Sequence, residues 1–362
     1  MAEYPDVDGE RRFDPGALTA SAVAIFEACG MSAEDAHIVS DSLVAADKRG
    51  IHSHGLLRIE DYVKKLLDDG VDPKGRPSIV SRKAGAIRVD GANALGQIPG
   101  VSAMRAAIEA ARETGIAFAA VGQSNHCGAL DYYTLMAAEA GMVGIAGTNA
   151  LPTMAPWGGR DKIVGLNPIS IAMPTEGRRP FVLDTALGAT AHGKIRVYAQ
   201  KGAPIPEGWA FDAEGAPTTD ATAALEGLIQ PIGAFKGIGL AMAVGLLSTL
   251  LSDAGYGTES GNMVDGAYAG KDGQFYMAID VASFVDPAVF QSRLKEIIAA
   301  FEASARISPD ASIHAPGSLE ANIAERYARE GVPLNEECLA TIRRSAARAN
   351  APEGVFAERT VS

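Results

Sequence analysis

Residues 115–149 read GIAFAAVGQSNHCGALDYYTLMAAEAGMVGIAGTN. Two short apolar runs bounded by glycine, GIAFAAVGQ and GMVGIAGTN, are typical of buried strands. Residues 132–141 between them have the apolar content of a helix. A strand, a helix and a second strand in succession indicate an α/β unit whose sheet is at least partly parallel. This stretch therefore predicts the fold class of the middle of the chain.

The same texture continues on both sides of this unit. AGAIRVDG alternates like a strand, and ISIAMPT, FVLDT and QFYMAIDV are further strand candidates. Helices are predicted over residues 101–113 and, in a long apolar run, over residues 238–251. We therefore expect residues 83–286 to form an α/β lobe.

Both ends of the chain are expected to be helical. Asp14-Pro15 places a capping residue before a proline at a first helical position, and Ser32 begins a capping pattern. Helices predicted at the C-terminal end cover residues 287–307, 318–330 and 334–350. We predict a helical lobe built from residues 1–82 and 287–350, with a loose tail over residues 351–362.

Composition restricts the class of protein. The 362 residues carry a net charge of −12 without a concentrated basic run, which argues against a nucleic-acid partner. The three cysteines are widely spaced, so neither a disulfide framework nor a cysteine-based zinc site is expected. No signal peptide and no uninterrupted apolar run of about 18 residues is present. We expect a cytoplasmic protein with no membrane partner.

Two nucleotide-binding patterns occur only in incomplete form. The nearest match to G-x-G-x-x-G begins at Gly237, has Met242 in the last position and follows no predicted strand. The nearest phosphate-loop pattern runs from Gly188 to Ile195, where isoleucine cannot supply the hydroxyl that binds Mg²⁺. The sequence predicts neither a Rossmann fold nor a phosphate-loop NTPase.

Residues 51–58, IHSHGLLR, allow three interpretations: a metal site, a capped helix start, or an acid catalyst beside a carboxylate anchor. His52 and His54 do not share a helix face, and no third ligand stands at a usual zinc spacing, so no metal is predicted. His54 and Arg58 share a face if a helix begins near Gly55. An imidazole and a guanidinium so placed suit the reduction of a 2-oxo acid. A helix start with a surface arginine stays open.

Polar residues also follow two of the predicted strands. Ser124, Asn125 and His126 come between a strand and a helix, where ligands bind in α/β folds, although a satisfied turn histidine is an alternative. Residues 148–160, which lead to residues 165–168, are rich in Gly, Pro and Asn; such loops commonly line sites, although they can also be connectors.

Taken together, these stretches resemble the type-2, non-Rossmann malate/L-lactate dehydrogenase family. That family also includes sulfolactate, ureidoglycolate and diketogulonate oxidoreductases and cyclic ketimine reductases. The matching stretches run in order over residues 53–334: SHGLLRIEDYV, SNHCGALDYYTLMAAEAGMVGIAGTNA, MAPWGG, LNPISIAMP, FVLDTA, HGKIRVYAQKGAPIPEGWAFDAEGAPTTD, KGIGLAMAVGLL and PGSLEANIAERYAREGVPL.

The resemblance implies a homodimeric 2-hydroxy acid dehydrogenase that transfers a hydride between NAD or NADP and a small 2-oxo acid. By motif position, His54 is the proton donor, Ser53 its hydrogen-bonding partner and Arg58 the ligand of the substrate carboxylate, with His126 as the alternative catalyst. Further substrate-side residues are His192, Gly193 and Leu166. The cofactor-contacting residues are His126, Cys127, Gly128, Ala129, Leu130, Asp184, Thr185, Ala186, Lys194, Pro316, Gly317 and Ser318.

The chain departs from the family pattern at several positions. Leu166 and Gly188 replace hydroxyl-bearing residues, Gly245 stands where an acidic residue is common, and Ser318 where glutamate is usual. Leu166 makes the pocket more apolar, which puts a malate-like dianion in doubt. Lys194 stands where ketimine reductases have aspartate, which disfavours imine reduction. A cyclic imino acid reductase and a non-catalytic family member are the alternatives.

Overall fold

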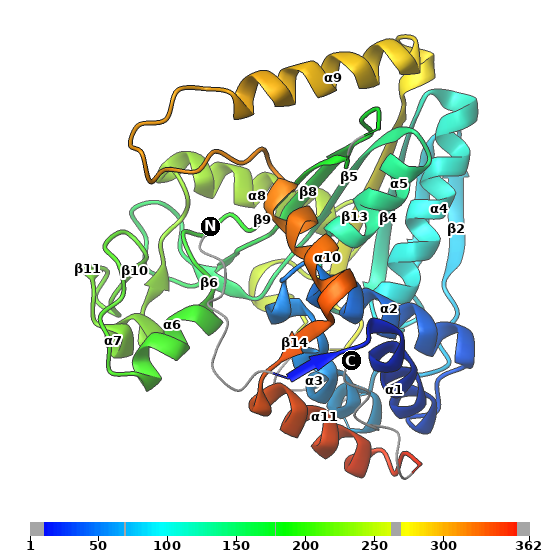
Figure 1. The fold of residues 1–362 in the computed structure, drawn as a ribbon. Coiled ribbons are helices and arrows are strands. Elements are labelled where there is room, and N and C mark those ends of the chain that lie inside the picture. Colours follow the sequence, from blue (N-terminus) through cyan, green and yellow to red (C-terminus); the bar gives the residue numbers. More distant parts are fainter. Residues whose placement is uncertain (1–10, 69, 178, 262–268, 353–362) are drawn as a thin grey trace.

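The computed structural model describes residues 11–68, 70–177, 179–261 and 269–352 (Figure 1). The helices are α1 (Pro15–Ala28), α2 (Ala33–Lys48), α3 (Ile59–Leu67), α4 (Gln97–Thr114), α5 (Asp131–Glu139), α6 (His192–Gln200), α7 (Ala221–Glu226), α8 (Phe235–Thr249), α9 (Pro287–Glu302), α10 (Ser318–Glu330) and α11 (Glu336–Arg348). The strands are β1 (Arg11–Phe13), β2 (Ser78–Lys83), β3 (Ala86–Asp90), β4 (Ile116–Ser124), β5 (Met142–Thr148), β6 (Pro152–Met154), β7 (Val164–Gly165), β8 (Ile169–Met173), β9 (Phe181–Thr185), β10 (Ala210–Phe211), β11 (Pro217–Thr218), β12 (Leu228–Ile229), β13 (Asp272–Asp280) and β14 (Val332–Leu334).

A seven-stranded mixed sheet forms the centre of the molecule, in the order β2-β3-β4-β13-β5-β8-β9. Only β3 and β4 run parallel among its strands, and the other neighbours are antiparallel. The predicted mixed sheet and the absence of a Rossmann arrangement are both confirmed. The apolar runs that predicted the strands correspond to β3, β4, β5, β8, β9 and β13.

The two faces of this sheet carry different cores, because successive side chains of a strand point to opposite faces. Tyr276 of β13 is buried with the residues of α4 and α5, whereas its neighbour Phe275 is buried with those of α8. Helices α4 and α5 thus pack on one face and α8 on the other. A small lobe of α6, α7 and the sheet β11-β10-β12 extends from the α8 side and adds to the same core.

The predicted union of the two chain ends is confirmed by one hydrophobic cluster. It joins residues of α1, α2 and α3 to Ile323, Tyr327 and Ile342 of α10 and α11. The two ends also pair directly, as β1 lies antiparallel to β14 with Phe13 opposite Val332. Asp14 accepts a hydrogen bond from Ala17 at the start of α1, as its position before proline predicted.

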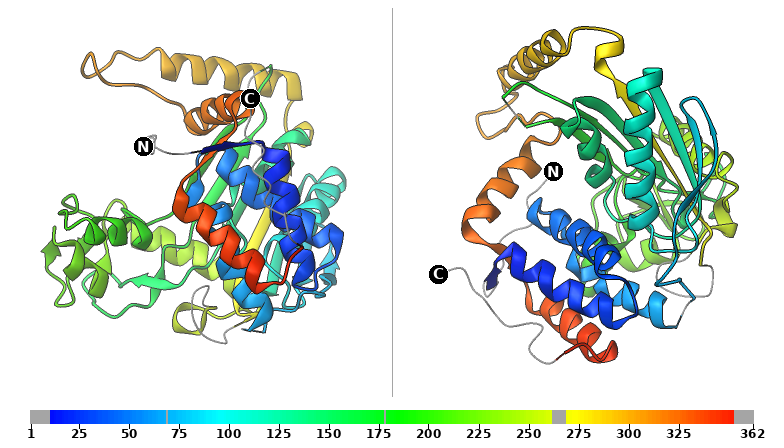
Figure 2. Two further views of the ribbon diagram at one scale, coloured as in Figure 1. Left: turned by 60° about the horizontal axis from the view of Figure 1, so that its bottom comes forward. Right: turned by 90° about the vertical axis from the view of Figure 1, so that its right-hand side faces the viewer.

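Helix α9 is shorter than predicted, ending at Glu302, and it buries only Ile298. It lies at the opposite end of the molecule from α1 and α11 (Figures 1 and 2). The sequence assigned residues 287–350, and therefore α9, to the helical lobe. The boundaries of the two lobes stay a prediction. Among the helices that the structure describes, none is long and apolar enough to cross a membrane. Most of the predicted tail lies outside the described residues.

Candidate active site

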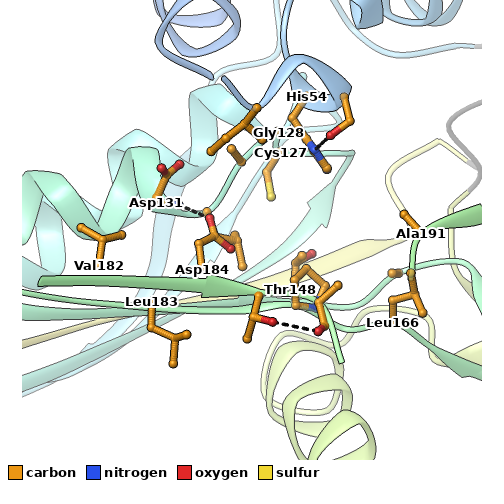
Figure 3. Close-up of a pocket in the computed structure, with 18 of the residues that line it drawn as sticks. His54, Cys127, Gly128, Asp131, Thr148, Leu166, Val182, Leu183, Asp184 and Ala191 are labelled. Atoms are coloured by element: carbon orange, nitrogen blue, oxygen red, sulfur yellow. Dashed lines mark hydrogen bonds between the residues drawn. The ribbon is translucent and has the colours of Figure 1, made fainter. Parts of the chain in front are cut away.

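A cavity of about 550 Å³ opens between the helical lobe and one end of the large sheet. Its walls come from the segment after α2 and from residues near the ends of β4, β5 and β9 (Figure 3). The turn before α10 adds residues 314–317. The lining residues are Arg49, Ile51, Ser53, His54, His126, Cys127, Gly128, Ala129, Leu130, Asp131, Thr148, Asn149, Ala150, Leu151, Leu166, Pro168, Val182, Leu183, Asp184, Thr185, Ala186, Ala191, Gly261, Asp272, His314, Ala315, Pro316, Gly317, Leu319 and Glu320.

Two histidines from distant parts of the chain meet in this cavity. The imidazoles of His54 and His126 are stacked, with ring centroids 5.9 Å apart and an interplanar angle of 15°. His54 belongs to a single-turn helix after α2, and His126 lies between β4 and α5, where the sequence placed it. The structure thus brings both predicted acid–base candidates to one site.

The backbone around His54 differs from the prediction of one helix face for His54 and Arg58. Two single-turn 3₁₀ helices, His52–His54 and Leu56–Arg58, meet at Gly55, and α3 begins only at Ile59. The buried carboxylate of Asp47 causes the break, because it accepts the Leu56 N–H at 2.8 Å. A Cβ on Gly55 would lie 2.1 Å from that carboxylate, so glycine alone fits there.

Asp47 also accounts for His52. The Nδ1 atom of His52 lies 2.7 Å from Asp47 Oδ1, so this histidine fixes the turn rather than joining the cavity. Burial raises the pKa of Asp47, and the hydrogen bond from His52 opposes that shift. Among the described residues no group of three His, Cys, Asp or Glu side chains is placed to hold a metal ion.

Ser53 and Arg58 surround His54 from its own segment. Ser53 Oγ lies 3.0 Å from His54 Nδ1, and Arg58 Nε donates to the Ser53 carbonyl at 2.7 Å. Arg58 Nη1 also pairs with Asp61 Oδ2 at 3.2 Å. Arg58 does not line the cavity, but its charge acts on both stacked imidazoles.

The hydrogen bonds of His126 fix its tautomer. The Gly128 N–H donates to His126 Nδ1 at 3.2 Å, so this nitrogen carries a lone pair and the ring proton is on Nε2. The Tyr62 hydroxyl lies 2.8 Å from the same Nδ1 and itself accepts from Gln97 Nε2 at 2.8 Å. With a backbone donor facing Nδ1, His126 is held as a neutral imidazole whose Nε2–H is a donor.

Both imidazoles are shifted towards their neutral forms. Burial, and to a smaller degree the Arg58 charge, lowers the pKa of His54 to about 4. Burial lowers the pKa of His126 well below its usual value, with further contributions from His54 and Arg58. At neutral pH without substrate, the site therefore presents two uncharged imidazoles.

An acidic network lies on the sheet side of the cavity. Arg49 Nε contacts Asp131 Oδ2 at 2.6 Å, and the Asp131 N–H donates to Asp184 Oδ2 at 2.7 Å. Burial and the neighbouring Asp131 charge raise the pKa of Asp184 to about 7. This chain of contacts ties the end of α2 to the start of α5 and the end of β9.

Most of the residues predicted for the site line this cavity. They are Ser53, His54, His126, Cys127, Gly128, Ala129, Leu130, Leu166, Asp184, Thr185, Ala186, Pro316 and Gly317. Five do not: Arg58, Ser318 and the α6 residues His192, Gly193 and Lys194. Their functional roles stay predictions.

The residues outside the cavity have other surroundings. Lys194 Nζ lies 4.9 Å from the centre of the Trp209 ring, within the small lobe. Ser318 lines an adjoining cavity of about 700 Å³ that shares His314, Ala315 and Pro316 with the first. The buried Oγ of Ser318 has no hydrogen-bond partner within the described part of the chain.

Several lining residues had little or no signal in the sequence. Thr148 and Asn149 were indicated only by the composition of their loop, and Arg49, Asp131 and Asp272 by nothing local. Asp272 stands at the start of β13, where burial raises the pKa of its carboxyl to about 7. Its place beside the cavity depends on long-range strand pairing, which a local pattern does not display.

Comparison with known proteins extends over nearly the whole chain. A profile of the malate/L-lactate dehydrogenase family matches residues 13–343. The chain belongs to this family. It is therefore an oxidoreductase of the 2-hydroxy acid dehydrogenase kind, and the resemblance inferred from its motifs is confirmed.

Curated relatives include proteins named for different substrates. A malate dehydrogenase of Pyrococcus abyssi is 40% identical over 287 residues, 76% of this chain and 78% of that protein. An NADP(+)-linked (2R)-3-sulfolactate dehydrogenase of Chromohalobacter salexigens is 36% identical over 76% of this chain and 84% of its own. An NAD(+)-linked ureidoglycolate dehydrogenase of Escherichia coli K12 is 31% identical over 85% and 88%.

Solved structures of related proteins match the fold. Sulfolactate dehydrogenase from Methanocaldococcus jannaschii aligns with a TM-score of 0.90 and 32% identity, covering 96% of this chain and all of that one. A Δ1-piperideine-2-carboxylate reductase from Pseudomonas syringae pvar. tomato aligns with a TM-score of 0.84 and 29% identity over 93% of this chain and 100% of its own.

Proposed function

We propose that the chain catalyses reversible hydride transfer between NAD or NADP and the 2-carbon of a small 2-oxo or 2-hydroxy acid. The stacked His54–His126 pair carries the proposal. It places an imidazole that can exchange a proton next to an imidazole whose Nε2–H is a fixed hydrogen-bond donor. When bound, the nicotinamide supplies or accepts the hydride. The residues of this chain bind the acid, move its proton and stabilise the developing charge.

We assign the proton transfer to His54. Ser53 is its partner at Nδ1, and a serine hydroxyl can donate to a neutral imidazole or accept from a protonated one. His54 can therefore hold either protonation state. During reduction it gives a proton to the carbonyl oxygen, and during oxidation it takes the proton of the hydroxyl.

We assign a donor role to His126. The Gly128 N–H prevents protonation at His126 Nδ1, so the ring cannot shuttle a proton between its two nitrogens. Its Nε2–H instead stabilises negative charge on the substrate oxygen, as a preorganised donor does in a buried site. Tyr62 and Gln97 support this orientation from behind.

Arg58 is the proposed anchor of the substrate carboxylate. Its Nε is occupied by the Ser53 carbonyl, which holds the guanidinium beside the His54 segment. Its charge is close enough to lower the pKa of both histidines, so a bound carboxylate between them offsets that repulsion. Substrate binding thereby raises the pKa of His54 towards the range needed for proton donation.

The cofactor fits the shape of the site. The main cavity and the adjoining one share residues 314–316, so two cavities of about 550 and 700 Å³ lie side by side where the two halves of a dinucleotide would bind. Ser318 Oγ, at the start of α10, is buried without a hydrogen-bond partner among the described residues, and it provides a hydrogen-bonding group beside the adjoining cavity. The loop over residues 126–130 and Asp184 would hold the nicotinamide end, and residues 316–318 the rest.

A second copy of the chain is the proposed partner, forming a homodimer. A surface helix normally buries an apolar stripe, but α9 leaves Val289, Ile297 and Phe301 exposed, the last two at 60% and 53%. Helix α8 likewise exposes Phe235 and Leu240. We also propose a cytoplasmic location, with which the three free cysteines agree.

The test is a rate assay with NADH and with NADPH across a panel of 2-oxo acids. Oxidation of a reduced cofactor by at least one 2-oxo acid supports the proposal, and it identifies the cofactor as well. A cyclic imine belongs in the same panel, because the piperideine-carboxylate reductase shares the fold. Turnover of the imine alone would replace 2-oxo acid reduction by imine reduction.

A further inference from the structure

Two of the departures from the family pattern are neighbours: Leu166 lines the cavity, and Gly188 lies beside its side chain. A Cβ on Gly188 would lie 2.4 Å from Cδ2 of Leu166 and 3.0 Å from Cγ2 of Ile229. Carbon atoms do not approach to 2.4 Å without a displacement. The Leu166 side chain therefore occupies the space that any side chain at position 188 would need.

A third departure makes room for the next residue of the same loop. A Cβ on Gly245 in α8 would lie 2.5 Å from Nδ2 of Asn167. That amide donates to the Ala241 carbonyl at 2.8 Å, and its Oδ1 accepts the Ala150 N–H at 2.9 Å. The side chains of Leu166 and Asn167 thus occupy space that is free only because residues 188 and 245 are glycines. The three departures form one matched set rather than separate losses.

The loop gives one side of the cavity an apolar character. Leu166 and Ala191 lie on one side of the site and Asp131 and Asp184 on the other (Figure 3). Leu151 also lines the cavity, and its segment pairs with β7 directly before Leu166.

The charges of the cavity disfavour a second anionic group on the substrate. Among the described lining residues, Arg49 is the one lysine or arginine, and its Nε is paired with Asp131 at 2.6 Å. Asp184, Asp272 and Glu320 add acidic groups to the same lining. A dianionic substrate would bring its second charge into a lining whose one described cation, Arg49, already neutralises Asp131.

We propose that Leu166 is a specificity-determining residue that selects 2-oxo acids with an uncharged, apolar side chain. This inference rests on the proposed function and names its substrate class. The substrate side chain packs against Leu166 and Ala191, while Arg58 and the two histidines act on the carboxylate and the 2-oxo group. Gly188 is the partner that lets Leu166 take this position.

The test compares kcat/KM for 2-oxopentanoate and for oxaloacetate in the wild type, Leu166→Thr and the control Leu67→Thr. Leu67 is exposed on α3 and does not line the cavity. We expect the wild type to prefer 2-oxopentanoate at least about tenfold. Leu166→Thr should lower kcat/KM for 2-oxopentanoate about tenfold and leave that for oxaloacetate unchanged or higher. Leu67→Thr should change neither.

A wild-type preference for oxaloacetate, or an unchanged preference in Leu166→Thr, overturns the inference and leaves the proposed function standing. No reduction of any 2-oxo acid overturns the proposed function and, with it, this substrate class. The matched pair has its own readout in thermal unfolding. Gly188→Ala alone should lower the Tm. In the double variant Gly188→Ala/Leu166→Thr, the second change should remove most of that loss. Additive changes in Tm contradict the packing of Leu166 against position 188.

Discussion

The assignment of His54 as the acid predicts a specific pH dependence of 2-oxo acid reduction. Its pKa of about 4 means that half of the free enzyme carries a protonated imidazole at that pH, and progressively less does at higher pH. At pH 7 roughly one molecule in a thousand carries the proton. Rising pH removes the protonated form, so kcat/KM for reduction should fall about tenfold per pH unit from about pH 5 to about pH 8.

Oxidation of the 2-hydroxy acid needs the neutral imidazole, which the lowered pKa already provides. Its kcat/KM should therefore stay level over the same range. The assay measures initial rates in both directions at saturating cofactor and low substrate, in a buffer of constant ionic strength. A reduction profile that is flat at acidic pH and breaks near 6.5, the ordinary histidine value, would refute the reasoning.

Two matched variants separate the histidines. His54→Gln should lower kcat by about 10²–10⁴-fold and abolish the slope with pH, because the titrating acid is lost. His126→Gln should lower kcat by about 10²–10³-fold, the effect of a lost oxyanion donor, and keep the slope. If the slope persists in His54→Gln and disappears in His126→Gln, the two roles are exchanged.

Three further changes test the anchor, the turn and the dimer. Arg58→Met should lower kcat/KM by about 10–100-fold, because a charge-assisted hydrogen bond to the substrate carboxylate is lost. The same change should raise the pKa of His54, so that the decline of the reduction rate begins at a higher pH. An unchanged pH profile would contradict this. Gly55→Ala should reduce the free energy of unfolding, measured by chemical denaturation, by about 2 kcal/mol, because the new Cβ meets the Asp47 carboxylate. The control Gly239→Ala has open space at its Cβ and should not reduce it. Light scattering should show a monomer for Ile297→Asp, which places a charge on the exposed apolar face of α9. The control Ile79→Asp, on the exposed strand β2, should stay a dimer. A dimer in both variants would exclude α9 from the interface.

The sequence predicted the large sheet well where strands are apolar on both sides. Runs such as those of β4 and β5 are buried between α4, α5 and α8, so their composition reveals them directly. Strand β2 gave no such signal, because it is the exposed edge of the sheet. The β1–β14 pair was also missed, since two strands of three residues each are too short to recognise without their partner.

The sequence predicted most of the individual residues of the site, but it did not predict how these residues are arranged relative to one another. His54 and His126 stood out individually as polar groups at element ends, but their stacking depends on the packing of the helical lobe against β4. The turn at Gly55 was interpreted as a helix because its cause, the buried Asp47, belongs to the preceding helix. The contacts among Arg49, Asp131 and Asp184 likewise arise only when three elements meet.

The most direct test of the central claim follows the hydride itself. A reduced nicotinamide cofactor deuterated at the transferring position is incubated with the protein and the 2-oxo acid that it reduces best. Mass spectrometry of the 2-hydroxy acid should show one deuterium on the 2-carbon, and none when the deuterium is on the opposite face of the nicotinamide. A product that carries no deuterium from either face, or no product at all, would contradict hydride transfer at this site.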